Sequence, residues 1–520
     1  MRYIYNAAVP SETAAEWSFI MKTAAIFSNN MVLQRNKNVR IFGTCTQTCT
    51  GITVSIPELG KSAEAVICGE KWEAVLPPME AYSKCTMLIK SAEKEIRFEN
   101  IAIGEVWLAG GQSNMEFELQ NDKNGSEALE GCSCENVRYY YTPKCSIADD
   151  SLKAMEENTC WMLPDKENSK SWSAVGYYFA KELSRRLGVT VGILGCNWGG
   201  TSASAWMKRE YLERDSRIRP YIDEYDKAIE GKTDEQMKAE YDEYTEYHVQ
   251  WEKNMQKCYS ENPSAKWEEI LAVCGENRYP GPMGSSNPMR PCGLYETMIS
   301  RVSPYTLGGV IYYQGESDDH RPDTYDVLLK ALIENWRNDW RDDSLPFMLV
   351  QLPMFKYEAD EDIKHWAKIR QAQMKVYKTV KNTGIASVLD CGEFNNIHPI
   401  DKAPVGHRLY LQAMYHIYGD NDAMKAFPPV YRSFEVCGDC VKLYFDYCDG
   451  FDVRGDLIGF EAAGADGVYY PASAEICGDV IEARSDSVSV PVSVRFQWTN
   501  YADVTLFGKN GLPVQPFVTQ

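Results

Sequence analysis

The stretch GEVWLAGGQSNMEF, residues 104–117, places a single serine at the end of an apolar run. Residues 105–110 have the character of a strand buried on both faces, and the chain after Ser113 has a helical character. A serine between Gln112 and Asn114 at such a position either caps the following helix or takes part in chemistry. The surrounding sequence must distinguish these two interpretations.

Similar apolar runs recur along the chain and predict an α/β domain over residues 103–426. The runs are EVWLAG, VTVGILGCNW, LGGVIYYQG, PFMLVQL and GIASVLD, each bounded by Gly or Pro. Helical stretches such as SWSAVGYYFAKELSRRLG and YDVLLKALIENWRNDWR separate them. This alternation predicts a parallel sheet with helices on both faces.

Other patterns flank and interrupt this domain. Residues 22–102 and 427–520 alternate apolar and polar residues in short runs, which predicts an antiparallel β domain and a C-terminal β region. Residues 208–290 are charged and prone to form helix, so we expect a helical insertion that packs on the body or shapes a substrate mouth. We interpret residues 1–21 as a lead segment and expect it to be disordered.

Size and composition limit the function. The chain has 520 residues, too many for one core, and its net charge of −20 excludes binding to a phosphate backbone. We see no apolar run of membrane-spanning length and no secretory signal, so we expect a cytoplasmic protein that is not bound to membrane. The 17 cysteines indicate reduced thiols, and the close pairs Cys132/Cys134 and Cys437/Cys440 are a weak pattern for a metal.

Three predicted strand ends carry polar or glycine residues that suit a site. They are Ser113, the group Gly199, Gly200 and Thr201, and the group Gln314, Gly315, Glu316 and Ser317. Each has an alternative explanation, because glycines allow tight turns and Ser or Thr cap helices. In open α/β sheets, however, ligands bind at the carboxyl ends of strands, so three such ends indicate one site.

A serine nucleophile needs a base, and the chain has six histidines. His398 is the strongest choice, because the motif LDCGEFNNIHPIDK places it in a loop after a buried strand. The other five lie in predicted helices or in an acidic loop: His248, His320, His365, His407 and His416.

Four motifs in order, GGQSNM, WGGTSASAWM, YYQGES and NIHPIDKAPVGHRL, resemble the sialate O-acetylesterases of the SGNH (GDSL-like) hydrolase superfamily. The resemblance extends over roughly residues 22–520 and is weakest across 120–170 and 210–285. It implies an SGNH-hydrolase α/β fold and a carbohydrate esterase that needs no metal or cofactor.

The resemblance also implies roles for individual residues. Ser113 would attack the ester carbonyl, and His398 would act as its base. The N–H groups of Ser113 and Gly200 and the side-chain amide of Gln314 would hold the oxyanion, with Gly199 as the alternative glycine.

One position departs from the pattern. Many SGNH enzymes have an aspartate three residues before the histidine, whereas this chain has Asn395. A backbone carbonyl could orient the imidazole in a Ser–His dyad. Alternatively, an acid (Asp390, Glu393 or Asp401) could substitute, or the enzyme could be impaired.

Three further residues have two interpretations each. Glu316 either supports the serine loop through backbone amides or transfers a proton. Trp198 and Trp206 either stack on a sugar or pack in the core.

The predicted function is release of acetate from O-acetylated carbohydrate, with O-acetyl sialic acid as the first substrate. Acetylated plant polysaccharides such as xylan, xyloglucan or mannan are the alternative substrates. Two competing hypotheses remain: a non-catalytic carbohydrate-binding protein on the same scaffold, and a glycosidase using Glu316 and Asp318. The sequence makes no prediction of oligomeric state.

Overall fold

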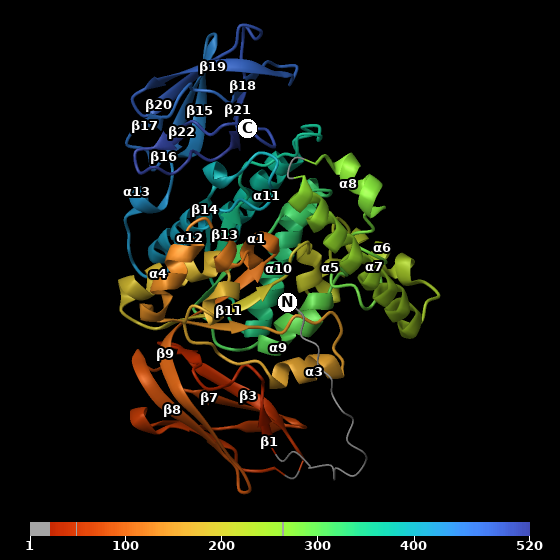
Figure 1. Ribbon diagram of the computed structural model, residues 1–520. Coiled ribbons are helices and arrows are strands. Elements are labelled where there is room, and N and C mark those ends of the chain that lie inside the picture. The colour runs from red at the N-terminus through yellow and green to blue at the C-terminus, as the bar shows by residue number, and fades with distance from the viewer. Residues whose placement is uncertain (1–20, 48, 263–264, 520) are drawn as a thin grey trace.

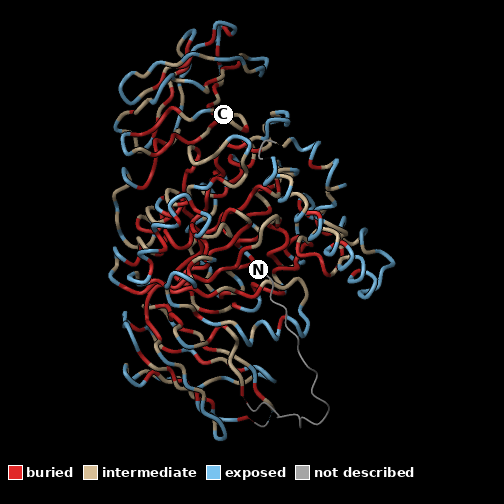
Figure 2. The backbone as a smooth tube through the Cα atoms, in the orientation of Figure 1, coloured by how far each residue is buried: buried red, intermediate tan, exposed pale blue. Residues whose placement is uncertain are grey.

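The computed structural model describes residues 21–47, 49–262 and 265–519, arranged as an N-terminal β region, a central α/β body and a C-terminal β region (Figure 1). Most of the predicted lead segment, residues 1–20, lies outside the described residues, and Met21 begins the first strand. Buried residues are most concentrated along the strands of the central body (Figure 2). Within the described residues, no helix combines the length and the apolar character needed to cross a membrane.

The N-terminal region contains short strands in two sheets, and their pairing is antiparallel except that β2 pairs parallel with β9. One sheet has the order β1-β3-β7-β6, and β4, β5 and β8 extend a second sheet from β9. The strands are β1 (Met21–Thr23), β2 (Val32–Gln34), β3 (Val39–Cys45), β4 (Thr53–Ile56), β5 (Lys61–Glu64), β6 (Val66–Cys68), β7 (Lys71–Leu76), β8 (Tyr82–Lys90) and β9 (Glu95–Gly111).

Strand β9 connects the N-terminal region to the central body. Its 17 residues begin with a half-exposed segment and end with eleven consecutive buried residues. The first half pairs antiparallel with β8, and the second half lies between parallel strands. The boundary expected between residues 102 and 103 therefore falls inside one strand, and the predicted parallel sheet is part of a larger mixed sheet.

The parallel part of that sheet has the order β10-β11-β9-β12-β13-β14. Its further strands are β10 (Val137–Tyr141), β11 (Val191–Asn197), β12 (Gly309–Tyr313), β13 (Phe347–Gln351) and β14 (Thr383–Ser387). Because β9 is flanked by β11 and β12, the carboxyl ends of these three strands are adjacent. The three polar strand ends found in the sequence therefore lie side by side.

Helices cover both faces of the parallel strands. On one face, Trp107 of β9 packs edge-on against Phe179 of a helix. On the other face, a Cβ on Gly110 would lie 3.0 Å from Trp336 of a second helix. The four long covering helices are α4 (Ala174–Leu187), α10 (Tyr325–Trp340), α11 (His365–Thr379) and α12 (Ala403–His416).

A helical insertion between β11 and β12 lies beside the body in Figure 1. The insertion contains α5 (Arg209–Glu213), α6 (Pro220–Ile229), α7 (Asp234–Glu261) and α8 (Trp267–Cys274). The remaining helices are α1 (Ser113–Glu116), α2 (Gly125–Gly131), α3 (Asp150–Glu157), α9 (Ser300–Val302) and α13 (Ala423–Ala426).

The C-terminal region forms antiparallel sheets around a hydrophobic cluster of its own. Cys437 and Cys440 face each other across the β15–β16 turn, so this spacing belongs to a hairpin. The strands are β15 (Val430–Cys437), β16 (Cys440–Asp446), β17 (Phe451–Val453), β18 (Phe460–Ala463), β19 (Tyr469–Cys477), β20 (Val480–Arg484), β21 (Ser493–Phe496), β22 (Leu506–Gly508) and β23 (Phe517–Val518).

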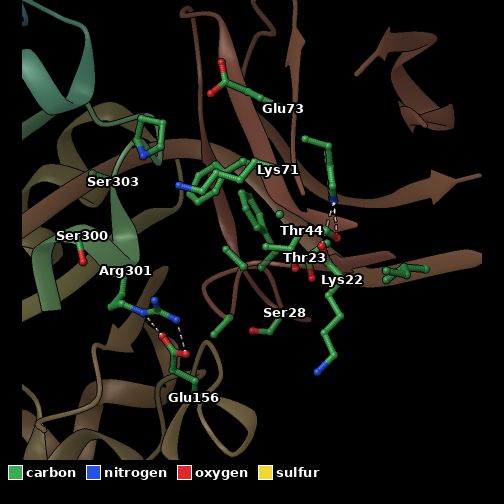
Figure 3. A pocket seen from close by; sticks show the side chains of 18 of the residues that line it. Lys22, Thr23, Ser28, Thr44, Lys71, Glu73, Glu156, Ser300, Arg301 and Ser303 are labelled. Carbon is green, nitrogen blue, oxygen red and sulfur yellow. Dashed lines mark hydrogen bonds and ion pairs between the residues drawn. The ribbon is translucent and has the colours of Figure 1, made fainter. Parts of the chain in front are cut away.

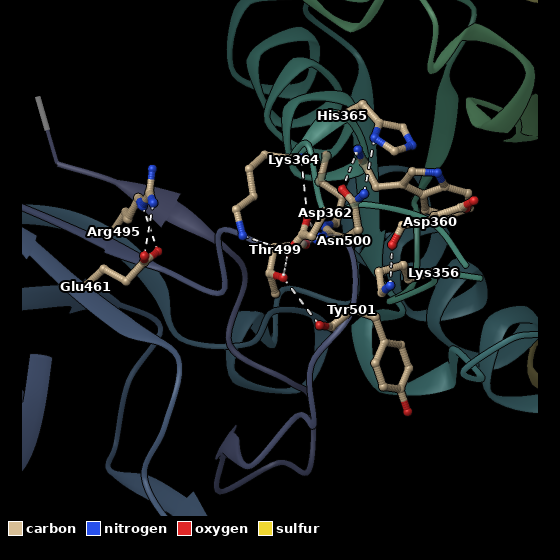
Figure 4. Close-up of polar contacts among 12 residues, drawn as sticks. Lys356, Asp360, Asp362, Lys364, His365, Glu461, Arg495, Thr499, Asn500 and Tyr501 are labelled. Atoms are coloured by element: carbon tan, nitrogen blue, oxygen red, sulfur yellow. Dashed lines mark hydrogen bonds and ion pairs between the residues drawn. The ribbon is translucent and has the colours of Figure 1, made fainter. Parts of the chain in front are cut away.

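Polar contacts attach the C-terminal region to the body near the start of α11 (Figure 4). The side-chain oxygen of Asn500 accepts from the backbone N–H of Trp366 at 3.1 Å, and its amide nitrogen lies 3.1 Å from His365 Nδ1. The backbone N–H of Asn500 donates to Asp362 at 3.1 Å. A residue of the C-terminal region thus caps a helix of the body.

Candidate active site

Ser113 and His398 meet at the carboxyl edge of the parallel sheet. Ser113 is the first residue of α1, directly after β9, and His398 lies in the loop between β14 and α12. The Oγ of Ser113 is 2.8 Å from Nε2 of His398, within hydrogen-bond distance. Both residues are half-buried. The arrangement can transfer a proton from a serine to an imidazole.

The other five histidines have different partners. His248 stacks on Tyr244 in the insertion, and His416 packs edge-on against Phe427. His365 pairs with Asp319, and His407 pairs with Glu182. His320 packs against Tyr221. The pairing expected from the sequence is therefore the one that the structure brings together.

Two side chains beside Ser113 connect its turn to the neighbouring strand ends. The side-chain oxygen of Gln112 accepts from the backbone N–H of Ser317 at 3.1 Å, which joins the ends of β9 and β12. One carboxylate oxygen of Glu116 accepts from the backbone N–H of Gly199, and the other pairs with Lys144. These contacts fix the serine turn against the turns that follow β11 and β12.

A buried polar network, not foreseen from the sequence, connects the serine turn to the histidine loop. The Asn114 amide nitrogen donates to Glu316 at 2.6 Å and to the carbonyl of Ile397 at 3.0 Å. Its amide oxygen accepts from Lys402 Nζ at 2.5 Å. Because Asn114 follows Ser113 and Ile397 precedes His398, this one side chain fixes the separation of the two reactive groups.

Burial perturbs the titration of this network. It lowers the pKa of Lys402 to about 8, against the opposing effect of Glu316 and other acids. Burial also raises the pKa of Glu316, whose second oxygen has no hydrogen-bond partner in the described structure. The expectation that Glu316 bonds backbone amides of the serine loop is wrong, because its partner there is the side chain of Asn114.

The pKa of His398 is lowered, first by burial and then by the Lys402 ammonium, while the Glu116 carboxylate acts in the opposite direction. A lowered pKa keeps the imidazole neutral at neutral pH. A neutral imidazole is the form that can accept the serine proton.

The histidine loop is fixed by its own side chains. The Asn396 oxygen accepts from the backbone N–H of His398 at 3.1 Å. Glu393 accepts from the Asn396 amide and from the backbone N–H of Ile400, so its carboxylate spans the loop. Asn395 has a positive φ of 62° and bonds to Glu358, away from the imidazole.

None of the proposed substitute acids contacts His398. Asp390 forms an ion pair with Arg408, Asp401 pairs with Lys123, and Glu393 is occupied as described. In the described part of the chain, no carboxylate and no backbone carbonyl forms a hydrogen bond with Nδ1 of His398. The carbonyl that a dyad was expected to use is therefore not in place.

Backbone N–H groups are available for an oxyanion. Those of Ser113 and Gly200 have no acceptor among the described residues, whereas that of Gly199 is bound to Glu116. Gly199 instead allows the two turns to approach closely, because a Cβ there would lie only 3.2 Å from the Ser113 Cβ. The geometry thus favours Gly200 over Gly199 as the donor.

The expected oxyanion role of Gln314 is wrong for this geometry. Its amide nitrogen already faces Asp318 at 2.7 Å and the Thr201 carbonyl and Gln112 oxygen at 3.2 Å each. An amide has two N–H donors, so none remains for a ligand.

Asp318 also accepts from Ser202, Ala203 and Tyr221 and is fully buried. It connects three segments and cannot act as a glycosidase carboxylate.

The two tryptophans differ. Trp206 is completely buried, with its indole N–H on Thr201, so it packs in the core and cannot stack on a sugar. Trp198 is half-buried against the same core and leaves part of its surface accessible.

One large cavity lies away from this site. It measures about 1460 Å³ and lies between the N-terminal strands and the body, with Lys71, Glu73 and Arg301 among its walls (Figure 3). A smaller cavity of about 520 Å³ borders Gly200 and Ser317. Among the described residues, no group of three or more His, Cys, Asp or Glu side chains is placed to hold a metal ion.

Comparison with known proteins reveals clear relatives. Residues 284–409 match the family "Carbohydrate esterase, sialic acid-specific acetylesterase", a segment that includes Gln314 and His398. Mouse sialate O-acetylesterase is 25% identical over 551 aligned residues, covering 96% of this chain and 94% of the mouse protein. The human sialate O-acetylesterase is 24% identical, covering 77% and 71%.

A solved structure extends the similarity to the fold. A carbohydrate acetylesterase from Xanthomonas citri superposes with a TM-score of 0.76 and 28% identity, covering 96% of this chain and all of that one. The resemblance predicted from the four sequence motifs is therefore confirmed, and the comparisons support an enzyme that hydrolyses carboxylic esters.

Proposed function

We propose that this protein is a serine esterase of the SGNH type that releases acetate from O-acetylated carbohydrate by means of a Ser113–His398 dyad. The observation that carries the proposal is the 2.8 Å contact between Ser113 Oγ and His398 Nε2. The names of its relatives support acetylated sugars as the substrate class and introduce acetylated sialic acid as one candidate.

In the proposed first step, Ser113 Oγ attacks the acetyl carbonyl carbon while His398 takes the serine proton. The N–H groups of Ser113 and Gly200 hold the negative oxygen of the tetrahedral intermediate. This intermediate collapses to an acetyl-serine, and His398 returns its proton to the sugar hydroxyl that leaves.

The second step repeats this chemistry with water. His398 removes a proton from a water molecule, which attacks the carbonyl carbon of the acetyl-serine. As the bond between that carbon and Ser113 Oγ breaks, His398 returns the proton to Oγ, so acetate and free Ser113 are released. Among the described residues, no carboxylate bonds directly to the imidazolium formed in each step. The nearby Glu116 carboxylate favours it electrostatically, since that group raises the pKa of His398.

Acetate release by the Ser113→Ala variant tests the proposal. We expect a loss of a thousandfold or more, on the order of other serine-nucleophile deletions. The double variant with His398→Ala should be little worse, because the two groups act as a unit. Ser260→Ala, an exposed serine in α7, is the matched control. Retention of more than roughly a tenth of the activity by Ser113→Ala would show that another group is the nucleophile.

A further inference from the structure

The cavity of about 520 Å³ beside the reaction centre is built largely by the helical insertion. Tyr221 and Tyr225 of α6 form part of its wall, and Tyr279 comes from the segment that leads back from the insertion to the body. Gly200 and Ser317 complete the side nearest Ser113. The volume lies within the range of about 300–1,000 Å³ that is usual for small-molecule sites.

Tyr279 brings this cavity to the reacting atoms. A Cβ on Gly200 would lie 1.9 Å from the Tyr279 hydroxyl oxygen, so the phenol lies directly over the glycine whose N–H is free. Tyr279 is 48% exposed, and its hydroxyl has no hydrogen-bond partner within the described residues. The phenol is therefore available to a ligand whose ester is at Ser113.

The wall is held in place from behind. The Tyr221 hydroxyl donates to the buried Asp318 at 2.7 Å, and Ser202 donates to the same oxygen at 2.6 Å. On the insertion side, the His248 ring lies 6.3 Å from the Tyr279 ring and stacks on Tyr244. The pocket is thus preorganised, which lowers the entropic cost of ligand binding.

The chemistry of the wall suits a sugar ring. Tyr225 and Tyr279 offer apolar ring faces together with hydroxyl groups, whereas the hydroxyls of Tyr221 and Ser202 are committed to Asp318. Such surfaces can contact the C–H face of a pyranose while bonding its hydroxyls.

The charge of the wall distinguishes between sugars. Among its described lining residues there is no Lys or Arg, and the carboxylate of Glu224 is present. Arg321 lies against the Tyr221 ring, but its guanidinium is paired with Glu224. Since Glu224 and Arg321 neutralise each other, the described wall offers the carboxylate of a sialic acid no unpaired Lys or Arg, and that carboxylate would lose its hydration without gaining a cationic partner.

We propose that this pocket binds the ring of an uncharged O-acetylated sugar and disfavours acetylated sialic acid. This inference rests on the proposed esterase function and names the substrate class of the same site. The insertion, through α6 and Tyr279, is then the element that sets specificity.

The first experiment uses variants of the pocket wall and compares a substrate that contains a sugar with one that does not. Tyr225→Ala and Tyr279→Leu are assayed on an O-acetylated methyl glucoside and on 4-nitrophenyl acetate, which has no sugar. We expect the ratio of kcat/KM values, sugar over 4-nitrophenyl acetate, to fall at least tenfold. The exposed Tyr259→Ala in α7 should leave the ratio unchanged. An unchanged ratio in whichever of the two variants folds overturns the pocket assignment.

The second experiment tests charge. The wild-type kcat/KM should be higher for the acetylated glucoside than for 9-O-acetyl-N-acetylneuraminic acid. Glu224→Gln frees Arg321 and should raise kcat/KM for the sialic acid several-fold relative to the glucoside. The exposed Glu230→Gln, at the residue that follows the end of α6, is the control. Equal or better wild-type hydrolysis of the sialic acid overturns the selection of uncharged sugars.

Failure of the function itself is recognised separately. Ser113→Ala must abolish hydrolysis of both sugar esters and of 4-nitrophenyl acetate. If it does not, the esterase mechanism is wrong whatever the pocket variants do. If it does, an unchanged ratio in Tyr225→Ala and Tyr279→Leu refutes only the pocket.

Discussion

At the scale of single residues, two nearby groups of opposite charge shift the pKa of His398 in opposite directions. The Lys402 ammonium lowers the pKa of His398, and the Glu116 carboxylate raises it, with burial as the largest effect in the lowering direction. Since His398 must be neutral to act as a base, kcat/KM should fall with decreasing pH at a midpoint below the ordinary histidine value of about 6.5.

Neutralising each charge should move that midpoint in opposite directions. Lys402→Met removes the cation, so the pKa of His398 and the acid limb of the pH profile should rise. Glu116→Gln removes the anion, so both should fall. The profile of kcat/KM between pH 4 and pH 8 (roughly the histidine range) measures this. Lys123→Met, which removes an exposed partner of Asp401, should leave the midpoint in place. Shifts of the same sign in both active-site variants would contradict the electrostatic assignment.

The absence of a carboxylate on His398 Nδ1 in the described structure predicts small effects at the nearby acids. Asp390→Asn, Glu393→Gln and Asp401→Asn should each lower kcat by less than about tenfold, whereas loss of a true triad aspartate costs about 10⁴. Asp390→Asn should instead lower stability, because Arg408 loses its partner. Acetate release and thermal unfolding, measured on the same preparations, separate the two effects. A thousandfold loss of kcat in any one variant would identify the missing third member.

Sequence patterns could predict that Ser113 and His398 lie together, but not the full set of contacts around them. Ser113 and His398 stand out because their types and positions at strand ends are uncommon. The occupancy of the Gln314 amide could not be foreseen, since its acceptors Asp318 and Thr201 come from distant segments. The role of Lys402 could not be predicted either. A lysine just before a helix is usually solvated, whereas Lys402 is buried and donates to Asn114.

At the scale of elements, the sequence periodicity predicted most strands but not where one strand changes its surroundings. In β9 the alternating half and the continuously apolar half belong to one extended segment, because its first residues have one solvated face and its last have none. A change of pattern therefore does not require a break in the strand.

The start of α11 shows an element completed by a distant residue. Its own preceding residue, Lys364, has φ of 66° and provides no side-chain cap. Asn500 accepts from the N–H of Trp366 instead. Asn500→Ala should therefore lower the free energy of unfolding by about 1–2 kcal/mol, the usual cost of losing an N-cap. Chemical denaturation measures this, with the exposed Asn421→Ala as control. No change in stability would mean that water replaces the cap without cost.

At the scale of the whole molecule, the site depends on segments from the entire body. Asp318 holds the turn after β12, the turn after β11 and α6 of the insertion, so the pocket and the reaction centre share one anchor. The residues that make these contacts are far apart in the sequence: Gln112 and Ser317 are separated by more than two hundred residues. Composition and local sequence patterns therefore could not predict the contacts.

The distribution of hydrophobic clusters predicts how the molecule unfolds. One cluster runs without a break from Met21 through the N-terminal strands to Met414, while residues such as Leu443 belong to a separate C-terminal cluster. Ile89 and Leu443 are both fully buried, and truncation of either to alanine should cost about 2–5 kcal/mol. Because β9 leads directly to Ser113 and joins the antiparallel and parallel parts of one sheet, Ile89→Ala should lower the midpoint of the thermal transition in which esterase activity is lost. Leu443→Ala should lower the midpoint of a different transition, in which the C-terminal region unfolds.

Calorimetry and residual activity after heating would be measured on both variants. A low-temperature transition in Ile89→Ala that leaves activity intact would show instead that the N-terminal strands unfold independently of the strand that ends at Ser113.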